Sequence, residues 1–212
     1  MNEIQTIIIY AIPVLFAITL HEFAHGFVAL LCGDGSAKMM GRLTLNPLKH
    51  IDPVGTIAVP IILYFSIGFV FGWARPVPVN FNALNRPKID MALVALAGPF
   101  ANLLMSFGWL IAFYIAEKYS IKPLLMMAII GIQINLLLML FNLIPLPPLD
   151  GSKVVSSFLT ENLSYYYNKL EQYSLYIIGG LIILSYTNTI NVFRFLTEAT
   201  RFIYNYMISF LV

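Results

Sequence analysis

The sequence predicts an all-α polytopic membrane protein, with residues 1–212 forming a single integral membrane domain. The chain is 59% hydrophobic and only 10% charged, whereas about 25% of the residues of a soluble domain are charged. Apolar runs of about 20 residues, enough to cross a bilayer, recur along the chain and leave no stretch for a separate soluble domain. The net charge of +2 is too small to indicate a nucleic-acid partner, so the expected surroundings are the lipid bilayer.

The first span is expected from Ile4 to Leu31, and the glycines of the following CGDG stretch end it. Glu3 stands where a secretory signal would be basic, and the apolar run is too long for a signal sequence. We therefore expect the run to be retained. The lone Cys32 excludes an internal disulfide and is expected to fill space as a small apolar side chain.

The next apolar run, residues 54–74, is long enough to span but contains Pro60 and several glycines. Basic residues flank it on both sides, and both flanks would prefer the cytoplasmic face, which one crossing cannot provide. A re-entrant or strand-like element is therefore expected in preference to a full span. Such backbone must be covered by protein or line a wet cavity, so we expect a groove wall beside the first span.

Two clear spans are expected next, at residues 89–115 and 124–144. The second ends in NLIPLPPLDG, whose prolines stop regular helix. Residues 173–212 are expected to form accessory helices: a short apolar run, then a segment that is either an interfacial amphipathic helix or a last span. The total is about five to six membrane segments.

Three titratable side chains interrupt the first span in the sequence HEFAH. His21 and His25 are four residues apart, so a helix places them on one face with Glu22 beside them. In the H-E-x-x-H pattern the two imidazoles bind Zn²⁺ and the glutamate accepts a proton from the attacking water. An ionisable group inside a membrane costs roughly 2.5 to 3.5 kcal/mol, and coordination offsets that cost. The motif therefore indicates a metal site rather than polar packing between helices.

A hydrolytic zinc site usually has three protein ligands, so a third is required. The candidates are His50, Asp34, Asp52, Asp90, Glu117, Asp150, Glu161, Glu171 and Glu198. Most of them lie in charged loops, where a solvated side chain is expected. Asp150 differs because it follows an apolar span within PLPPLDG, although a turn aspartate is an equally good interpretation of the residues alone.

The pairing of HEFAH with NLIPLPPLDG, with AGPFAN between them, resembles the site-2 protease family of intramembrane zinc metalloproteases. The core motifs occupy residues 18–151. The resemblance implies one Zn²⁺ per chain, with His21, His25 and Asp150 as ligands and Glu22 as the catalytic base. It indicates a compact member without PDZ or CBS domains.

The same resemblance assigns a role in substrate binding to three further residues. Asn142 matches an asparagine implicated in holding substrate, while Gly98 and Asn102 match the family's G-x-x-x-N element. Hydrogen bonding between helices is an equally good interpretation of both asparagines.

The implied activity is hydrolysis of peptide bonds in a membrane-embedded protein substrate, as in regulated intramembrane proteolysis. The resemblance and the loop charges place the active site toward the cytoplasmic side of a prokaryotic cell membrane. The segment from Pro60 to Val79 is a candidate edge for an extended substrate peptide.

Two alternative functions remain open at this stage. In one, the protein is a membrane zinc protease of another architecture, and Glu161 or Glu171 is the third metal ligand instead of Asp150. In the other, a membrane transporter uses His21, Glu22, His25 and Asp150 as a path for cations or protons.

Overall fold

The computed structural model of the chain describes residues 3–68, 72–186 and 192–210. Every regular element in these ranges is helical, so an all-α fold is confirmed there. Within the described residues, three helices are long and apolar enough to cross a membrane: α1 (Glu3–Leu31), α4 (Pro87–Lys118) and α5 (Lys122–Asn142). Their positions agree with the three spans expected from the sequence.

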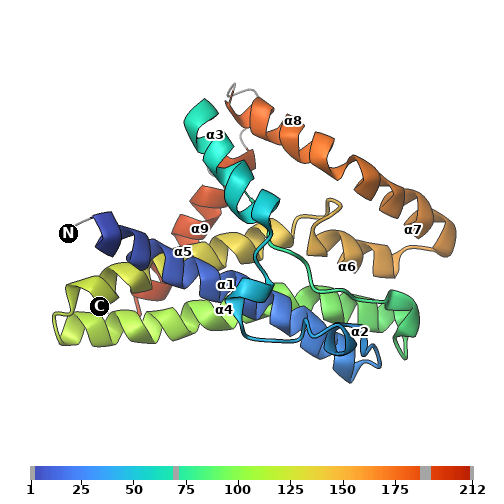
Figure 1. The fold of residues 1–212 in the computed structure, drawn as a ribbon, viewed down its shortest axis with the longest axis horizontal. Coiled ribbons are helices and arrows are strands. Elements are labelled where there is room, and N and C mark those ends of the chain that lie inside the picture. Colours follow the sequence, from blue (N-terminus) through green and yellow to red (C-terminus); the bar gives the residue numbers. More distant parts are fainter. Residues whose placement is uncertain (1–2, 69–71, 187–191, 211–212) are drawn as a thin grey trace.

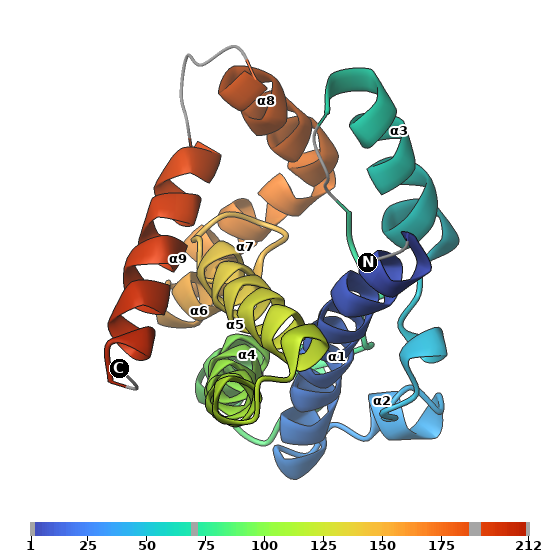
Figure 2. The same cartoon turned by 90° about the vertical axis from the view of Figure 1, so that its left-hand side faces the viewer.

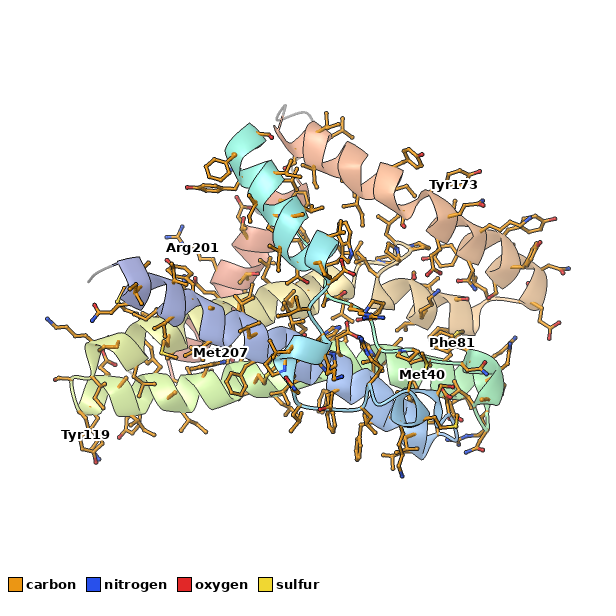
Figure 3. All side chains as sticks on the ribbon, viewed as in Figure 1. Met40, Phe81, Tyr119, Tyr173, Arg201 and Met207 are labelled. Atoms are coloured by element: carbon orange, nitrogen blue, oxygen red, sulfur yellow. The ribbon has the colours of Figure 1, made fainter. Side chains whose placement is uncertain are left out.

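The three long helices lie side by side, with α4 antiparallel to α1 and α5 (Figure 1). A core cluster of Ala128, Ile132 and Leu136 on α5 packs against Phe113 on α4. Met207, labelled in Figure 3, joins this cluster from α9 (Val192–Ile208). Much of the outer surface is apolar and exposed, as expected of helices that face lipid.

Shorter helices surround this bundle. The helices α6 (Asp150–Phe158), α7 (Glu161–Asn168) and α8 (Ser174–Tyr186) follow α5 in the chain, and α3 (Val59–Ile67) stands apart from the long helices in Figure 2. With 9 and 13 residues, α3 and α8 are shorter than the roughly 20 residues of a full crossing. The expected total of five to six membrane segments stays a prediction.

The second apolar run is helical where a re-entrant or strand-like element was expected. It begins with a π-helix, Pro53–Ala58, and continues into α3. Pro60 lies in the first turn of α3, where its missing N–H is tolerated, so it does not break the helix. The helix ends at Gly68, whose φ of 68° lies in the left-handed region. Residues 69–71 lie outside the described residues, and the re-entrant path stays a prediction.

Irregular chain connects α1 to α4, and we call residues 32–52 and 72–86 the loop region. It contains the short helix α2 (Ser36–Met39) and two 3₁₀ turns, Pro47–Lys49 and Phe81–Ala83. Figure 3 places Met40 and Phe81 of this region at the opposite end of the molecule from Tyr119. The loop region therefore lies where α1 ends and α4 begins.

Buried side chains hold the loop region together. Asp34 is 1% exposed; its Oδ1 accepts from Ser36 N and Oγ, and its Oδ2 accepts from Asn80 N at 2.7 Å. Burial raises the pKa of the Asp34 carboxyl, but the hydrogen bonds from Ser36 and Asn80 outweigh burial and lower the pKa below its ordinary value. Arg42 Nη2 donates to the carbonyl oxygens of Arg75 and Pro76, at 2.9 and 3.4 Å.

The expectation of solvated side chains is wrong at two positions of the loop region, Asp34 and His50, which are each 1% exposed. Asp90, in the first turn of α4, is likewise 1% exposed. His50 Nε2 donates to the Thr44 carbonyl oxygen, and Asp90 accepts from the backbone and side chain of Arg86. Each group is buried together with its hydrogen-bond partner, which local sequence composition does not reveal.

Candidate metal centre

Two imidazoles face each other on one side of α1. His21 and His25 are 8% and 9% exposed, and their rings meet edge to face with centroids 4.7 Å apart. Their Nε2 atoms are 3.0 Å apart. Spacing of four residues on a helix produces this arrangement.

Asp150 completes a triangle with the two imidazoles. Its Oδ2 lies 3.2 Å from His21 Nε2 and 3.3 Å from His25 Nε2, and the carboxylate stands at the first residue of α6. Among the described residues, these three form the one group of at least three His, Cys, Asp or Glu side chains close enough to share a metal ion.

The dimensions of the triangle fit a zinc ion. Ligand atoms about 2.0 to 2.1 Å from a tetrahedral Zn²⁺ lie about 3.3 Å from one another, and the three observed edges are 3.0, 3.2 and 3.3 Å. Asp150 Oδ2 is buried without a hydrogen-bond partner. A bound cation would supply the interaction that this oxygen lacks.

The outer nitrogens of the two rings define their tautomers. His25 Nδ1 lies 2.7 Å from the Val94 carbonyl oxygen, and His21 Nδ1 lies 2.5 Å from Asn102 Oδ1. Both partners are oxygens that can only accept, so each Nδ1 carries the proton. In a neutral ring with this tautomer, the Nε2 atom that faces Asp150 is unprotonated, as a metal ligand must be.

Two glycines permit the close packing around this centre. A Cβ atom at Gly98 of α4 would collide with His25 Nε2 and would lie 2.6 Å from His21 Nε2. A Cβ atom at Gly151 would collide with the Leu143 carbonyl oxygen at the end of α5. Gly98 thus lets α4 approach the histidines, and Gly151 lets α6 begin directly against α5.

Glu22 lies beside the histidines and is tied to the loop region. Its Oε2 accepts from Val77 N at 2.8 Å. The Val77 side chain is 7% exposed and packs over Gly26, where a Cβ would lie 2.9 Å from Val77 Cγ1. The structure therefore brings the end of the Pro60–Val79 segment against α1 next to Glu22.

The asparagines matched by the motifs occupy different places. Asn102 is fully buried behind His21, so it touches a candidate ligand directly. Asn142 lies in the last turn of α5, where its Nδ2 donates to the Leu138 carbonyl oxygen at 3.0 Å. The recorded contacts of the described residues join Asn142 to its own helix and do not join it to the metal ligands.

Sequence reasoning missed Asn135. This fully buried residue of α5 accepts from Asn102 Nδ2 at 2.9 Å. An amide in the middle of an apolar span is a signal by itself, because an unpaired polar group there is costly. No motif includes the residue, and its partner is 33 positions away.

The other acidic candidates lie elsewhere. Glu171 pairs with Lys153 at 2.6 Å, and Glu198 pairs with Arg194 at 2.8 Å. Glu161 is exposed in the first turn of α7. None of these three belongs to the described three-residue group.

Curated proteins resemble this chain over most of its length. It is 38% identical over 179 residues to "Putative zinc metalloprotease YwhC" of Bacillus subtilis, an alignment that covers 81% of this chain and 78% of the relative. It is 30% identical over 174 residues to "Putative zinc metalloprotease Rip2" of Mycolicibacterium smegmatis, covering 80% and 64%. "Putative zinc metalloprotease MJ0611" of Methanocaldococcus jannaschii is 42% identical over 97 residues, covering 45% and 50%. No protein-family model matches the chain, and no solved structure matches it.

The fold provides apolar helices long enough to span a membrane and a group of three side chains that could hold a metal ion. Together with the relatives, these features define a membrane zinc metalloprotease. More specifically, the chain belongs to the site-2 protease family, as the resemblance implied.

Proposed function

We propose that this protein is an intramembrane protease that uses one Zn²⁺ per chain to hydrolyse peptide bonds of membrane-embedded protein substrates. The observation that carries the proposal is the triangle of two buried imidazole nitrogens and one buried carboxylate oxygen that lacks a hydrogen-bond partner. His21 and His25 lie in a helix long enough to span the membrane. A substrate cut at this position would itself lie within the bilayer.

His21, His25 and Asp150 would hold the metal. A bound Zn²⁺ supplies Lewis acidity, which polarises a peptide carbonyl and makes water nucleophilic near neutral pH. Glu22 would accept the proton of the attacking water and return it to the leaving amine. The Val77 N–H fixes Oε2 of this carboxylate, which leaves Oε1 as the atom that would take the proton.

The remaining motif residues would serve the site in two ways. Gly98 would keep α4 close to the ligands, and Asn102 would orient His21. Asn142 would hold the substrate backbone near Asp150, a role that side-chain amides fill in other hydrolases. Of the two asparagines, Asn142 would thus be the one in contact with substrate.

The charge distribution supports a cytoplasmic orientation of the site. The loop-region end of the bundle carries six basic residues between α1 and the first turn of α4: Lys38, Arg42, Lys49, Arg75, Arg86 and Lys88. The opposite end of the α4–α5 pair carries Lys118 and Lys122. His25 lies six residues before the end of α1, roughly 9 Å of helix, so the site lies nearer to the positive end. In a prokaryotic cell membrane that end would face the cytoplasm.

Both alternative functions receive less support. A site completed by Glu161 or Glu171 disagrees with the position of Asp150, since Glu171 pairs with Lys153 instead. A cation or proton path would need a continuous series of groups that exchange ions. The two Nε2 atoms and Asp150 Oδ2 lie within 3.3 Å of one another. This spacing favours tight coordination of one metal ion over passage of ions through the site.

The proposal is tested with detergent-purified wild type, Asp150→Asn and Glu22→Gln. We expect one zinc per chain in the wild type and in Glu22→Gln, and loss of zinc from Asp150→Asn. Both variants should fail to cleave a single-span reporter in liposomes. Glu171→Gln, which alters an exposed ion pair, is the matched control and should retain zinc and cleavage.

Two results would contradict the proposal. Zinc retained in Asp150→Asn would remove that residue from the ligand set and revive the alternative zinc architecture. If the wild-type protein binds no zinc, cleaves no substrate and conducts ions across the liposome membrane, the transporter function would be favoured.

A further inference from the structure

We propose that Asn135 is a positioning residue for the metal centre: acting through Asn102, it fixes the tautomer of His21 and holds one ligand nitrogen ready for the metal. The inference deepens the proposed function and rests on it for the identity of the metal. We call the chain of hydrogen bonds from Asn135 through Asn102 to His21 the relay. The inference of the relay rests on the geometry alone.

The orientation of the Asn135 amide is defined by its own helix. Asn135 is fully buried, and its Nδ2 donates to the Gly131 carbonyl oxygen one turn earlier in α5, at 2.8 Å. With the nitrogen committed to that carbonyl, the oxygen of the amide faces α4. There it accepts from Asn102 Nδ2 at 2.9 Å.

The orientation of the Asn102 amide follows from that contact. Asn102 Nδ2 donates both to Asn135 Oδ1 and to the Ala17 carbonyl oxygen of α1, at 3.2 Å. Both amide protons are therefore used, and the oxygen is the atom that meets His21 Nδ1. Because this oxygen only accepts, the proton of the ring must sit on Nδ1, and Nε2 is left for the metal.

His25 reaches the same tautomer by a different route. Its Nδ1 lies 2.7 Å from the Val94 carbonyl oxygen, which is always an acceptor and needs no further support. Asn102 is less constrained, since its side-chain amide can turn by 180° and present nitrogen where oxygen was. Two acceptors oppose that turn, Asn135 Oδ1 at 2.9 Å and the Ala17 carbonyl oxygen at 3.2 Å. Without Asn135 Oδ1 only the longer contact remains, so the turned amide becomes accessible and favours a proton on His21 Nε2, the atom that faces Asp150.

The relay therefore predicts an asymmetric response to mutation. Removing the Asn135 amide should disturb His21 and spare His25. A mutation that only loosens packing should change the tautomers of both histidines or of neither. Leu136, the next residue of α5 and also fully buried, provides a control that removes buried volume without touching the relay.

The first measurement is the tautomer of each histidine in the full-length, metal-stripped protein. It is read from ¹⁵N–¹H correlation spectra of ¹⁵N-histidine-labelled samples, at a pH alkaline enough for every imidazole to be neutral. The chain has three histidines, and His50 donates from Nε2 to Thr44, so its spectrum identifies the opposite tautomer. We expect Nδ1–H for His21 and His25 in the wild type and in Leu136→Ala. In Asn135→Ala we expect a mixture at His21 and an unchanged His25.

The second measurement is zinc affinity by chelator competition. We expect Asn135→Ala to weaken binding by about 10- to 100-fold and Leu136→Ala by less than about threefold, because partners of a ligand's outer nitrogen tune the ligand.

Asn135→Asp, whose carboxyl is neutral when buried, keeps an acceptor for Asn102. This variant should therefore show the wild-type tautomer spectrum.

A single Nδ1–H tautomer at His21 in Asn135→Ala would overturn the relay, as would equal loss of affinity in the two alanine variants. A wild type that binds no zinc would contradict the proposed function. The tautomer spectra would still decide the relay in that case, so the two failures are distinguishable.

Discussion

The polar groups of the helical bundle and those of the loop region are organised differently. Inside the bundle, Asn135, Asn102 and His21 form a chain of contacts between side chains, and further contacts reach backbone carbonyl oxygens such as that of Ala17. In the loop region, Asp34 and Arg42 bind backbone groups of residues 75–80, because that chain forms no ladder of its own. The bundle therefore builds the metal ligands, and the loop region holds the path of the chain beside them.

Glu22 is the point where the two organisations meet. It belongs to α1 by sequence, but its carboxylate is held by the Val77 N–H of the loop region. Changes in the bundle should thus remove the metal, whereas changes in the loop region should spare the metal and affect the base or the local stability.

The largest effect is expected from Gly98→Ala. The added methyl group would occupy the space of the two Nε2 atoms, so zinc binding should fall by at least about 100-fold, the upper range for disturbed ligand geometry. Zinc content by elemental analysis checks it. Gly108→Ala on the same helix is the control, since a Cβ there meets nothing within 4 Å. Full zinc in Gly98→Ala would show that α4 does not limit the site.

The next effect is expected from Val77→Pro, which removes the N–H that holds Glu22. A hydrogen bond to a charged group contributes about 1.5 to 3 kcal/mol, so kcat should fall by about 10- to 100-fold while zinc content stays unchanged. Val77→Ala keeps the N–H and should retain most activity. Equal loss in the two variants would assign the effect to packing on Gly26.

A smaller effect is expected from Arg42→Ala, which frees the carbonyl oxygens of Arg75 and Pro76. Loss of these charge-assisted hydrogen bonds should destabilise the loop region by about 1.5 to 3 kcal/mol. Hydrogen exchange of residues 73–80 should accelerate with no change in zinc content. If hydrogen exchange of residues 73–80 stays slow in Arg42→Ala, contacts other than those of Arg42 stabilise the conformation of this segment.

The smallest effect concerns the pH dependence of Asp34. Its carboxyl has a folded-state pKa below the ordinary value of 3.8, so its ionised form stabilises the fold. That contribution is fully present above pH 3.8 and is lost as the pH falls through the lowered folded pKa. The difference in unfolding free energy between wild type and Asp34→Asn should therefore shrink as the solution is acidified. A constant difference would show that the ionised form is not the stabilising one.

The sequence predicted the three long helices and the common face of His21 and His25, for physical reasons that apply locally. Span length follows from bilayer thickness, and the common face of His21 and His25 follows from helical periodicity. Asp150 could be singled out by its place after an apolar span, but only the family resemblance made it a ligand.

The remaining features depend on which helix faces meet, and periodicity does not determine that. Asn135 belongs to no motif, and its role follows from the contact of α5 with α4 opposite His21. Polar composition similarly suggested solvated side chains at Asp34 and His50, which the tertiary structure buries. Residues 59–67 accommodate Pro60 in α-helix because it falls in the first turn of α3, a position that only the start of the helix defines.

The most direct test of the metal centre is X-ray absorption at the zinc edge of the detergent-purified protein. The structure predicts a nitrogen and oxygen shell at about 2.0 to 2.2 Å, with scattering from two imidazoles. A sulfur shell at about 2.3 Å, which would make Cys32 a ligand, or scattering from fewer than two imidazoles would contradict a centre built from His21, His25 and Asp150.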